Sequence, residues 1–302
     1  LCRTLNQALA VAKGEYVAII ATDDLWLPDK LRIQVEALEK SPPEVGLIYS
    51  DAYRIDEAGN LLPGLFIESH RSLEKMPEGD ILKVLIKGNF LPAMTPLIRR
   101  AVYDKVGHFD ERLCYEDWDM WLRIAQQYQF AFCPTITAKY RIVGTSMSRT
   151  LLHSQDSNVF ASNYLLLSKC LDYPQLSPEL ERVVRNELSG LCKLQIVAHE
   201  LSTAIPAGSR YLLAEPHVLP VWADARRKPV PFVEKDGQDW GPPADDATAV
   251  DELARMIREG AQYFAIAWPS FWWLEHYKGF FEHLRSNFRC IRESEYVVVF
   301  EL

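Results

Sequence analysis

Short apolar runs alternate with amphipathic helical stretches through the first half of this 302-residue chain. Residues 15–21 form a β-branched apolar run that predicts a buried parallel strand, and residues 45–49 form a second run of the same kind. Between them, Leu31, Val35 and Leu38 recur at the spacing of one helix face. Strands that alternate with helices in this way predict an α/β fold with a mostly parallel sheet.

The alternation continues to the end of the chain, with a change of composition near residue 206. Further helices are expected at 71–88, 115–125, 157–170, 177–204, 247–259 and from Ser270, and further strands at 94–98, 130–133, 138–142, 263–268, 288–292 and 296–300. A proline-rich segment after residue 206 indicates a domain boundary. We therefore predict an α/β domain over 1–150, a helical extension over 151–205 and a small α/β domain over 206–302.

Composition limits the classes of partner. Hydrophobic residues make up 48% of the chain and charged residues 25%, which is typical of a soluble protein with a substantial core. The net charge of -8 argues against nucleic acid as the main partner, because nucleic-acid-binding proteins concentrate Lys and Arg on one face. A nucleotide ligand remains compatible with this charge, since a metal ion supplies positive charge locally.

Cysteine usage and hydropathy indicate the compartment. Six cysteines are scattered singly, without the CxxC pairs of a zinc site, and predict free, buried thiols in a reducing compartment. No apolar run approaches the about 18–20 residues of a membrane span. We therefore expect a cytoplasmic protein, or one peripheral to a membrane.

The start of the chain is unusual. It opens without Met, inside a helical pattern of Leu5, Leu9 and Ala12 that Gly14 closes as a helix C-cap does. A sequence that begins inside a helix is expected to be a fragment of a longer protein.

Two pairs of acidic residues are the candidates for metal binding and for catalysis. Asp23 and Asp24 follow the first strand, and carboxylates at a strand end can hold a hard divalent ion that bridges a diphosphate. Glu116 and Asp117 open the helix at 115–125, where a carboxylate can act as general base. Each pair also has a structural interpretation. The first pair caps the helix near Pro28 or makes an Asx-turn, and the second pair complements the dipole at a helix N-terminus.

The sequence segments around these pairs resemble the centre of the family 2 glycosyltransferases, which have the GT-A fold. The resemblance lies in Thr22-Asp-Asp-Leu-Trp-Leu-Pro-Asp-Lys-Leu31 and Tyr115-Glu-Asp-Trp-Asp-Met-Trp-Leu-Arg123. It extends, in order and approximate spacing, to the segments 6–9, 12–20, 45–51, 55–59, 99–111 and 138–142. It covers residues 1 to about 150 and implies the GT-A mixed sheet flanked by helices. The strand-helix-strand order of the C-terminal part separately suggests a smaller Rossmann-like α/β module.

The resemblance also implies roles. Asp23 falls on the last acidic position of the family's DxD motif, which holds Mn²⁺ or Mg²⁺ against the diphosphate of a nucleotide sugar. Asp117 falls on the Asp of the ED motif, the base that deprotonates the acceptor hydroxyl while the sugar is transferred with inversion. Glu116 is expected to contact the acceptor or to begin the helix, and Asp24 is grouped with the substrate contacts.

The chain departs from the family pattern at three places. Ala21 stands where the first Asp of DxD is expected, so Thr22 is the candidate for the missing contact. Val143 stands at the usual position of a His, so that Arg141, or the hydroxyls of Thr145 and Ser146, would serve near the diphosphate. The family's opening strand and its Asp-Gly-Ser segment are missing from the sequence.

The aromatic residues and the C-terminal module leave alternatives open. Trp118 and Trp121 lie at helical spacing, so that one can line a sugar site while the other packs in the core. The aromatic segment 271–277 is an interface or a packed helix, and His276 and His283 are surface or packing residues. No Gly-rich phosphate loop marks the module.

The leading prediction is a non-processive, inverting transfer of a sugar to a saccharide or other hydroxyl acceptor, in the synthesis of a surface glycan. The sequence contains neither the Gln-x-x-Arg-Trp motif nor the membrane helices of the family's processive members. One alternative is a catalytically degenerate GT-A scaffold, which Ala21 and Val143 favour. A second is nucleotidyl transfer, which needs a basic Gly-rich loop after the first strand.

Overall fold

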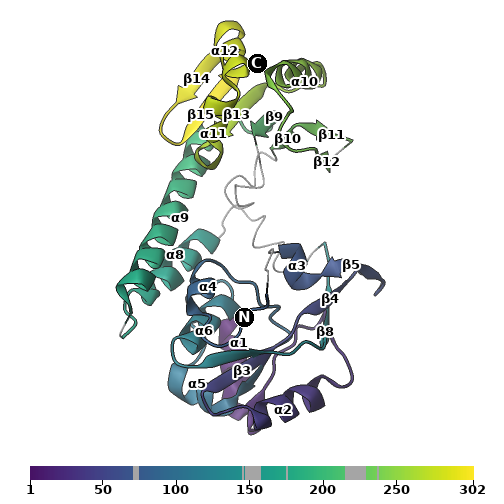
Figure 1. The fold of residues 1–302 in the computed structure, drawn as a ribbon, viewed down its shortest axis with the longest axis vertical. Coiled ribbons are helices and arrows are strands. Elements are labelled where there is room, and N and C mark those ends of the chain that lie inside the picture. Colours follow the sequence, from purple (N-terminus) through teal and green to yellow (C-terminus); the bar gives the residue numbers. More distant parts are fainter. Residues whose placement is uncertain (71–74, 145, 147–157, 175, 215–228, 237) are drawn as a thin grey trace. The chain divides into compact units, whose positions relative to one another are not determined.

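A computed structural model describes residues 1–70, 75–144, 146, 158–174, 176–214, 229–236 and 238–302 (Figure 1). The chain divides into two compact units. The first, the N-terminal unit, comprises Leu1–Arg149 with Ala161–Leu188, and the second, the C-terminal unit, comprises Thr150–Phe160 with Ser189–Leu302. Thr145, one of the candidate hydroxyls, lies outside the described residues.

The N-terminal unit holds two four-stranded mixed sheets. The first has the order β1-β6-β3-β7, formed by Tyr16–Val17, Leu97–Arg99, Val45–Tyr49 and Gln129–Phe132. The second has the order β2-β8-β4-β5, formed by Leu25–Trp26, Ala138–Arg141, Ala52–Ile55 and Leu61–Leu65. The β3–β7 and β4–β8 pairs are parallel, and the others are antiparallel.

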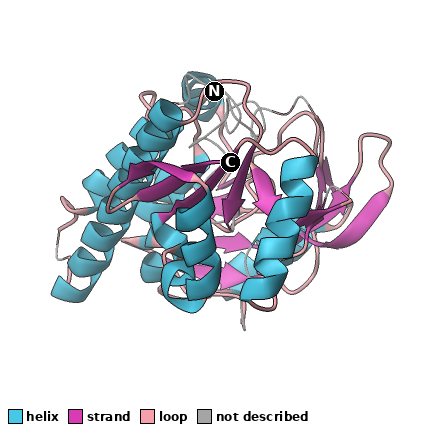
Figure 2. Ribbon diagram, turned by 90° about the horizontal axis from the view of Figure 1, so that it is seen from above, coloured by secondary structure: helices cyan, strands magenta, loops and turns pink. Residues whose placement is uncertain are grey.

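The strands of the chain are accompanied by helices, which are cyan in Figure 2. In the N-terminal unit they are α1 (Cys2–Val11), α2 (Lys30–Lys40), α3 (Phe66–His70), α4 (Leu82–Ile86), α5 (Arg100–Val106), α6 (Asp117–Ala125), α8 (Val159–Cys170) and the first part of α9 (Pro178–Ala204). The predicted mixed α/β sheet flanked by helices is confirmed.

Several predicted elements differ in detail. The strand expected over 15–21 is only Tyr16–Val17; it is half-buried and pairs antiparallel with β6, because β1 is the edge of its sheet. Leu31 is 46% exposed, and the buried positions of α2 are Lys30, Gln34 and Leu38. Of the apolar stripe expected from the sequence, Leu38 is buried and Val35 packs against the core, whereas Leu31 is exposed.

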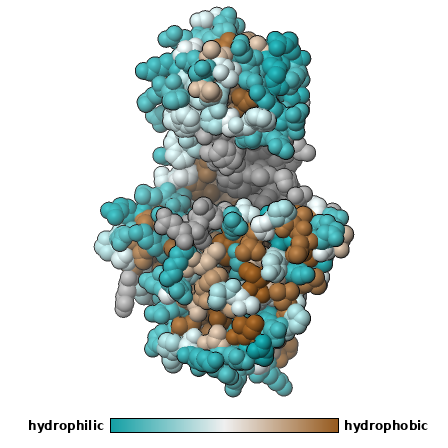
Figure 3. Space-filling model, turned by 45° about the vertical axis from the view of Figure 1, so that its right-hand side comes forward, coloured by the Kyte–Doolittle hydropathy of each residue, from teal (hydrophilic) through white to brown (hydrophobic). Residues whose placement is uncertain are grey.

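The surface of the N-terminal unit carries apolar side chains. Figure 3 shows them gathered on one face of this unit. Its exposed large apolar residues include Val11, Ile20, Leu25 and Leu61. Nothing in the described part of the chain covers them.

The C-terminal unit is a five-stranded mixed sheet between two layers of helix. The strand order is β10-β9-β13-β15-β14, formed by Val230–Phe232, Tyr211–Ala214, Tyr263–Ala267, Val297–Glu301 and Arg289–Glu293. Its helices are α10 (Asp246–Arg258), η3 (Trp268–Ser270), α11 (Trp272–His276) and α12 (Lys278–Asn287), and β11 (Glu234–Lys235) pairs with β12 (Gln238–Asp239). The pairs β10–β9 and β9–β13 are parallel, whereas β13–β15 and β15–β14 are antiparallel.

Both faces of this sheet are buried. Leu253, Trp273 and Phe280, from α10, α11 and α12, pack on one face, and Val197 and Leu201 of α9 pack on the other. Trp273 is 1% exposed whereas Trp272 is 43% exposed. The aromatic segment 271–277 is thus largely a packed helix.

Candidate active site

The strand directions bring several candidate residues to one edge of the first sheet. β1 and β3 both run antiparallel to β6, so they point the same way, and β7 is parallel to β3. The segments that follow these strands, including Asp23–Asp24 and Ser50–Asp51, therefore leave the sheet on the same side. In open α/β sheets, ligands bind outside the carboxyl ends of the strands.

The Asp23–Asp24 turn is fixed by the strand β8. Asp24 is buried, and its Oδ1 accepts a hydrogen bond from the backbone N–H of Arg141 at 2.9 Å. Burial raises the pKa of Asp24 to about 6. Asp24 therefore does not cap α2, whose N-cap residue is Asp29. The capping interpretation of this pair is wrong for Asp24.

Asp23 presents the free carboxylate of the turn. Its backbone carbonyl accepts a hydrogen bond from Arg141 Nε at 2.8 Å, but its side chain makes no hydrogen bond or ion pair with another described residue. Thr22 beside it is exposed. The turn thus holds one carboxylate by hydrogen bonding and leaves its neighbour open to a ligand.

Arg141 joins this turn to the one between β4 and β5. Its Nη1 donates to the carbonyls of Asp56 at 3.1 Å and Glu57 at 3.0 Å. In that second turn, Asp56 Oδ1 accepts from the backbone N–H of Asn60 at 2.8 Å. Arg141 therefore positions the acidic turn through Nε and Nη1, while Nη2 makes no hydrogen bond to a described residue.

Asp117 lies at the start of α6, and both of its carboxylate oxygens are held. Oδ1 accepts from the backbone N–H of Trp118 at 2.7 Å, and Oδ2 accepts from Asn89 Nδ2 at 2.7 Å. Burial raises the pKa of Asp117. Burial and the neighbouring Asp117 raise the pKa of Glu116 to about 7. A carboxylate whose pKa is raised toward neutrality is better suited to accept a proton.

The two tryptophans of α6 have different environments. Trp118 is half-buried, and its indole nitrogen donates to the carbonyl of Leu85 at 2.8 Å, which ties α6 to α4. Trp121 is 3% exposed and belongs to the core. Of the two, only Trp118 retains a partly exposed ring at the start of the helix.

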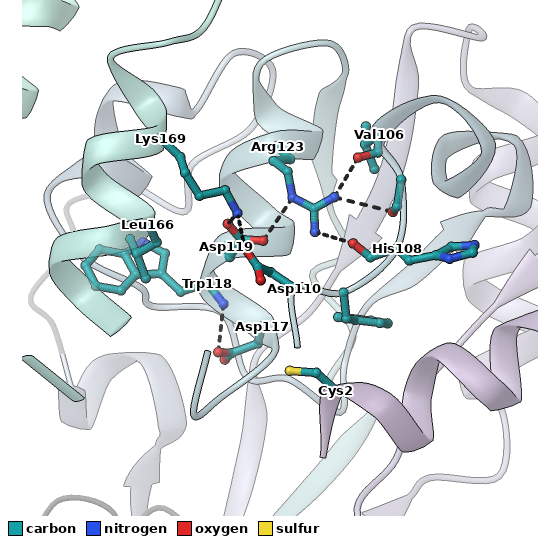
Figure 4. A network of polar contacts seen from close by, with 12 residues as sticks. Cys2, Val106, His108, Asp110, Asp117, Trp118, Asp119, Arg123, Leu166 and Lys169 are labelled. Carbon is teal, nitrogen blue, oxygen red and sulfur yellow. Dashed lines mark hydrogen bonds and ion pairs between the residues drawn. The ribbon is translucent and has the colours of Figure 1, made fainter. Parts of the chain in front are cut away.

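A network of ion pairs around the buried carboxylate of Asp119 lies close to Asp117 (Figure 4). Lys169 of α8 forms ion pairs with Asp119 and with Asp110, the latter at 3.0 Å. Asp119, 2% exposed, also accepts from Arg123 Nε at 2.9 Å, and Arg123 donates to the carbonyls of Val106 and His108. The network fastens α8 and the segment before α6 to the helix that carries the candidate base.

Sequence reasoning missed Asn89 and Lys169. Asn89 lies 28 positions before Asp117, and Lys169 lies 50 positions after Asp119. A single polar residue at such a separation has no local pattern that marks it. Only the packing of α4 and α8 against α6 brings these side chains to the site.

No group of three or more His, Cys, Asp or Glu side chains placed to hold a metal ion occurs among the described residues. Asp23 still fits a divalent ion, because Mg²⁺ is commonly bound through one or two carboxylates together with substrate phosphates and water. All six cysteines are free; Cys2, Cys133 and Cys170 are buried and the other three are half-buried. None of the described helices is both long and apolar enough to cross a membrane.

An α/β sheet with one free carboxylate at its edge, and a second carboxylate suited to proton transfer, defines a candidate enzyme that uses general-base chemistry. Residues 1–169 match the model of the family described as Glycosyltransferase like family 2. The match covers more than half of the chain, and the chain belongs to this family. This membership confirms the family resemblance found in the sequence.

Curated proteins match part of this chain. The chain is 30% identical over 138 residues to an uncharacterized glycosyltransferase, MJ1057, of Methanocaldococcus jannaschii, covering 45% of each chain. It is 25% identical over 146 residues to WfgD of Escherichia coli, named as a UDP-Glc:alpha-D-GlcNAc-diphosphoundecaprenol beta-1,3-glucosyltransferase, covering 47% of this chain and 52% of that protein. The chain thus spans about half the length of these curated relatives.

A solved structure is also similar. The mannosyltransferase PcManGT from Pyrobaculum calidifontis, in complex with GDP-Man and Mn2+, is 15% identical with a TM-score of 0.42, covering 68% of this chain and 55% of that chain.

Proposed function

We propose that this protein transfers a sugar from a nucleotide-diphosphate sugar to a hydroxyl of a saccharide acceptor, with inversion at the anomeric carbon. The observation that carries the proposal is Asp117, a carboxylate with a raised pKa whose two oxygens are held at the start of α6. Family membership supplies the reaction class.

In this reaction Asp117 accepts the proton of the acceptor hydroxyl as the oxygen attacks the anomeric carbon. The bond between that carbon and the diphosphate oxygen breaks, and the nucleoside diphosphate leaves with the electron pair. Asp117 then releases its proton to solvent. A single displacement of this kind yields the inverted glycoside.

Asp23 is the residue proposed to hold Mn²⁺ or Mg²⁺, and such an ion neutralises charge on the departing diphosphate. Its free carboxylate supports this role. Arg141 Nη2, Thr22 and Asp24 are proposed to face the diphosphate side of the site. Glu116 and the partly exposed ring of Trp118 are proposed to face the acceptor.

The acceptor is proposed to be a saccharide used in surface-polysaccharide synthesis. The name of the related WfgD, which specifies a diphosphoundecaprenol-linked saccharide, supports this class of acceptor. A lipid-linked acceptor also supports a cytoplasmic protein that associates peripherally with a membrane. The boundaries at 150 and 205 remain proposals, with 206–302 a small α/β domain attached to the catalytic domain.

Calorimetric titration of nucleoside diphosphates, with and without Mn²⁺, tests the binding half of the proposal. We expect one nucleotide to bind the wild type only with Mn²⁺, Asp23→Ala to abolish that binding, and Asp117→Ala to retain it. Asp251→Ala is the matched control, since Asp251 is an exposed residue of α10 in the other unit. Absence of any nucleotide binding by the wild type contradicts the proposal and favours the degenerate scaffold, which the replacement Ala21 would then explain.

A further inference from the structure

The segment from Asn89 to Thr95 connects α4 to β6. It contacts Asp117 at one end and residues that follow the Asp23–Asp24 turn at the other. Phe90 and Leu91 are each 2% exposed. At its carboxyl end, Trp26 Nε1 donates to the carbonyl of Met94 at 2.9 Å, and Lys30 Nζ donates to the carbonyl of Thr95. The segment is therefore pinned to residues that follow the Asp23–Asp24 turn closely in the chain.

Asn89 begins this segment and uses both ends of its amide. Oδ1 accepts from the backbone N–H of Leu91 at 3.1 Å, and Nδ2 donates to Asp117 Oδ2 at 2.7 Å. Because an N–H faces one end of the amide and a carboxylate faces the other, a single amide orientation satisfies both partners. The segment thus fixes the direction in which Asn89 donates.

We propose that Asn89 is a positioning residue for the base Asp117, an inference that rests on the proposed function. Its hydrogen bond holds Oδ2 and favours the ionised form of the carboxylate, which is the form that accepts a proton. A carboxylate oxygen has two lone pairs, so the bonds from Asn89 and Trp118 leave one on each oxygen for the acceptor hydroxyl. Asn89 therefore orients the base without blocking it.

The charged groups around Asp117 show why the hydrogen bond from Asn89 matters for the ionised form of this carboxylate. Among the residues that the structure describes, the titratable groups that face Asp117 are the Glu116 carboxyl and the Tyr115 phenol, and burial raises the pKa of both. Neither brings positive charge to the site. Asn89 and the backbone N–H of Trp118 are the hydrogen-bond donors to the Asp117 carboxylate among the described residues.

Asn89→Asp is the sharpest test, because the replacement has the same shape. It keeps an oxygen for the backbone N–H of Leu91 but places a carboxylate against Asp117 Oδ2. We expect kcat to fall about tenfold or more, the acid limb of the pH–kcat profile to move up by about one pH unit, and nucleotide affinity to stay unchanged. Asn89→Ser, which keeps the Leu91 contact but is too short to reach Asp117, is expected to show a smaller change in the same direction.

Asn6→Asp is the matched control, since Asn6 Oδ1 accepts from the backbone N–H of Phe109 at 2.9 Å and Asn6 Nδ2 donates to the exposed carboxylate of Glu111 at 3.1 Å. It is expected to leave kcat and its pH dependence at the wild-type values. Wild-type kcat and pH profile in Asn89→Asp, with a wild-type melting temperature, would overturn the inference.

Carboxyl NMR titration of Asp117 keeps this inference separate from the proposed function, because it needs no transfer. The pKa of Asp117 is expected to be higher in Asn89→Asp than in the wild type. If the wild type binds no nucleotide and transfers no sugar, the proposed function fails while the titration still tests the contact. An unchanged pKa of Asp117 refutes the role of Asn89 whatever the activity.

Discussion

The backbone N–H of Arg141 donates to Asp24 Oδ1 at 2.9 Å, and the Nε of the same residue donates to the Asp23 carbonyl at 2.8 Å. One residue at the end of β8 therefore fixes both members of the acidic turn. Because Asp24 is occupied by this contact, the free carboxylate at the sheet edge is that of Asp23.

Arg141→Lys is expected to weaken Mn²⁺-dependent nucleotide binding by about tenfold. A lysine ammonium lacks the planar fork by which Arg141 reaches the carbonyls of Asp23, Asp56 and Glu57 at once. The dissociation constant is measured calorimetrically. Arg258→Lys, at an exposed position of α10, is the control, and an unchanged constant in Arg141→Lys would show that the guanidinium does not set the turn.

Lys30 makes stability depend on pH. It is 1% exposed and forms no ion pair with a described residue, and burial lowers its pKa to about 7. In the unfolded chain a lysine keeps a pKa of about 10.4. Between these values the unfolded state binds the extra proton, so Lys30 makes the free energy of unfolding rise with pH, by up to about 1.4 kcal/mol per pH unit.

The measurement is urea unfolding of the wild type and Lys30→Met from pH 6 to pH 10. We expect the wild-type free energy of unfolding, minus that of Lys30→Met, to increase as the pH rises above about 7. Below about pH 7 this difference is expected to be constant. Lys40→Met, an exposed change in the same helix, should show no such trend. Parallel pH curves for wild type and Lys30→Met would contradict the lowered pKa.

Lys169→Met is expected to destabilise the protein by about 3 kcal/mol, because it removes one cationic partner of the buried Asp119 carboxylate. Lys83→Met removes an ion pair with Glu179 in which both side chains are about half exposed, and should cost less than about 1 kcal/mol. Chemical unfolding compares the two variants. Equal losses would mean that the network of Figure 4 contributes no more than a surface pair.

Two glycine replacements should have opposite effects. A Cβ at Gly46 in β3 would lie 2.8 Å from Tyr128 Cγ and 2.9 Å from Val102 Cγ2, so Gly46→Ala is expected to cost about 1–3 kcal/mol. Gly190 in α9 has open space around it, and Gly190→Ala is expected to stabilise the protein by about 0.5–1 kcal/mol. Thermal unfolding measures both, and a stabilising Gly46→Ala would contradict the packing of β3.

The elements that could be predicted are those whose signal is local. The helix of Asp117 was predicted because carboxylates precede an apolar stripe, and the mixed α/β fold because short apolar runs alternate with helical stretches. The burial of Lys30 in α2 was missed, because a lysine in a helical sequence gives no sign that it is covered. Asn89 could not be assigned, because its contact with Asp117 depends on the packing of α4 against α6.

Sugar transfer by wild type and Asp117→Asn tests the central claim most directly. Each protein is incubated with Mn²⁺, with sugar nucleotides of the base selected by calorimetry, and with a panel of saccharides that includes diphospholipid-linked ones, and the anomeric configuration of the product is read by NMR. We expect the wild type to form the inverted glycoside. We expect Asp117→Asn to bind nucleotide normally while its kcat falls at least about a thousandfold, which is on the order of the loss from removing a catalytic base, because the amide cannot accept the proton. Retained configuration, or near wild-type transfer by Asp117→Asn, would contradict the assignment of Asp117 as the base.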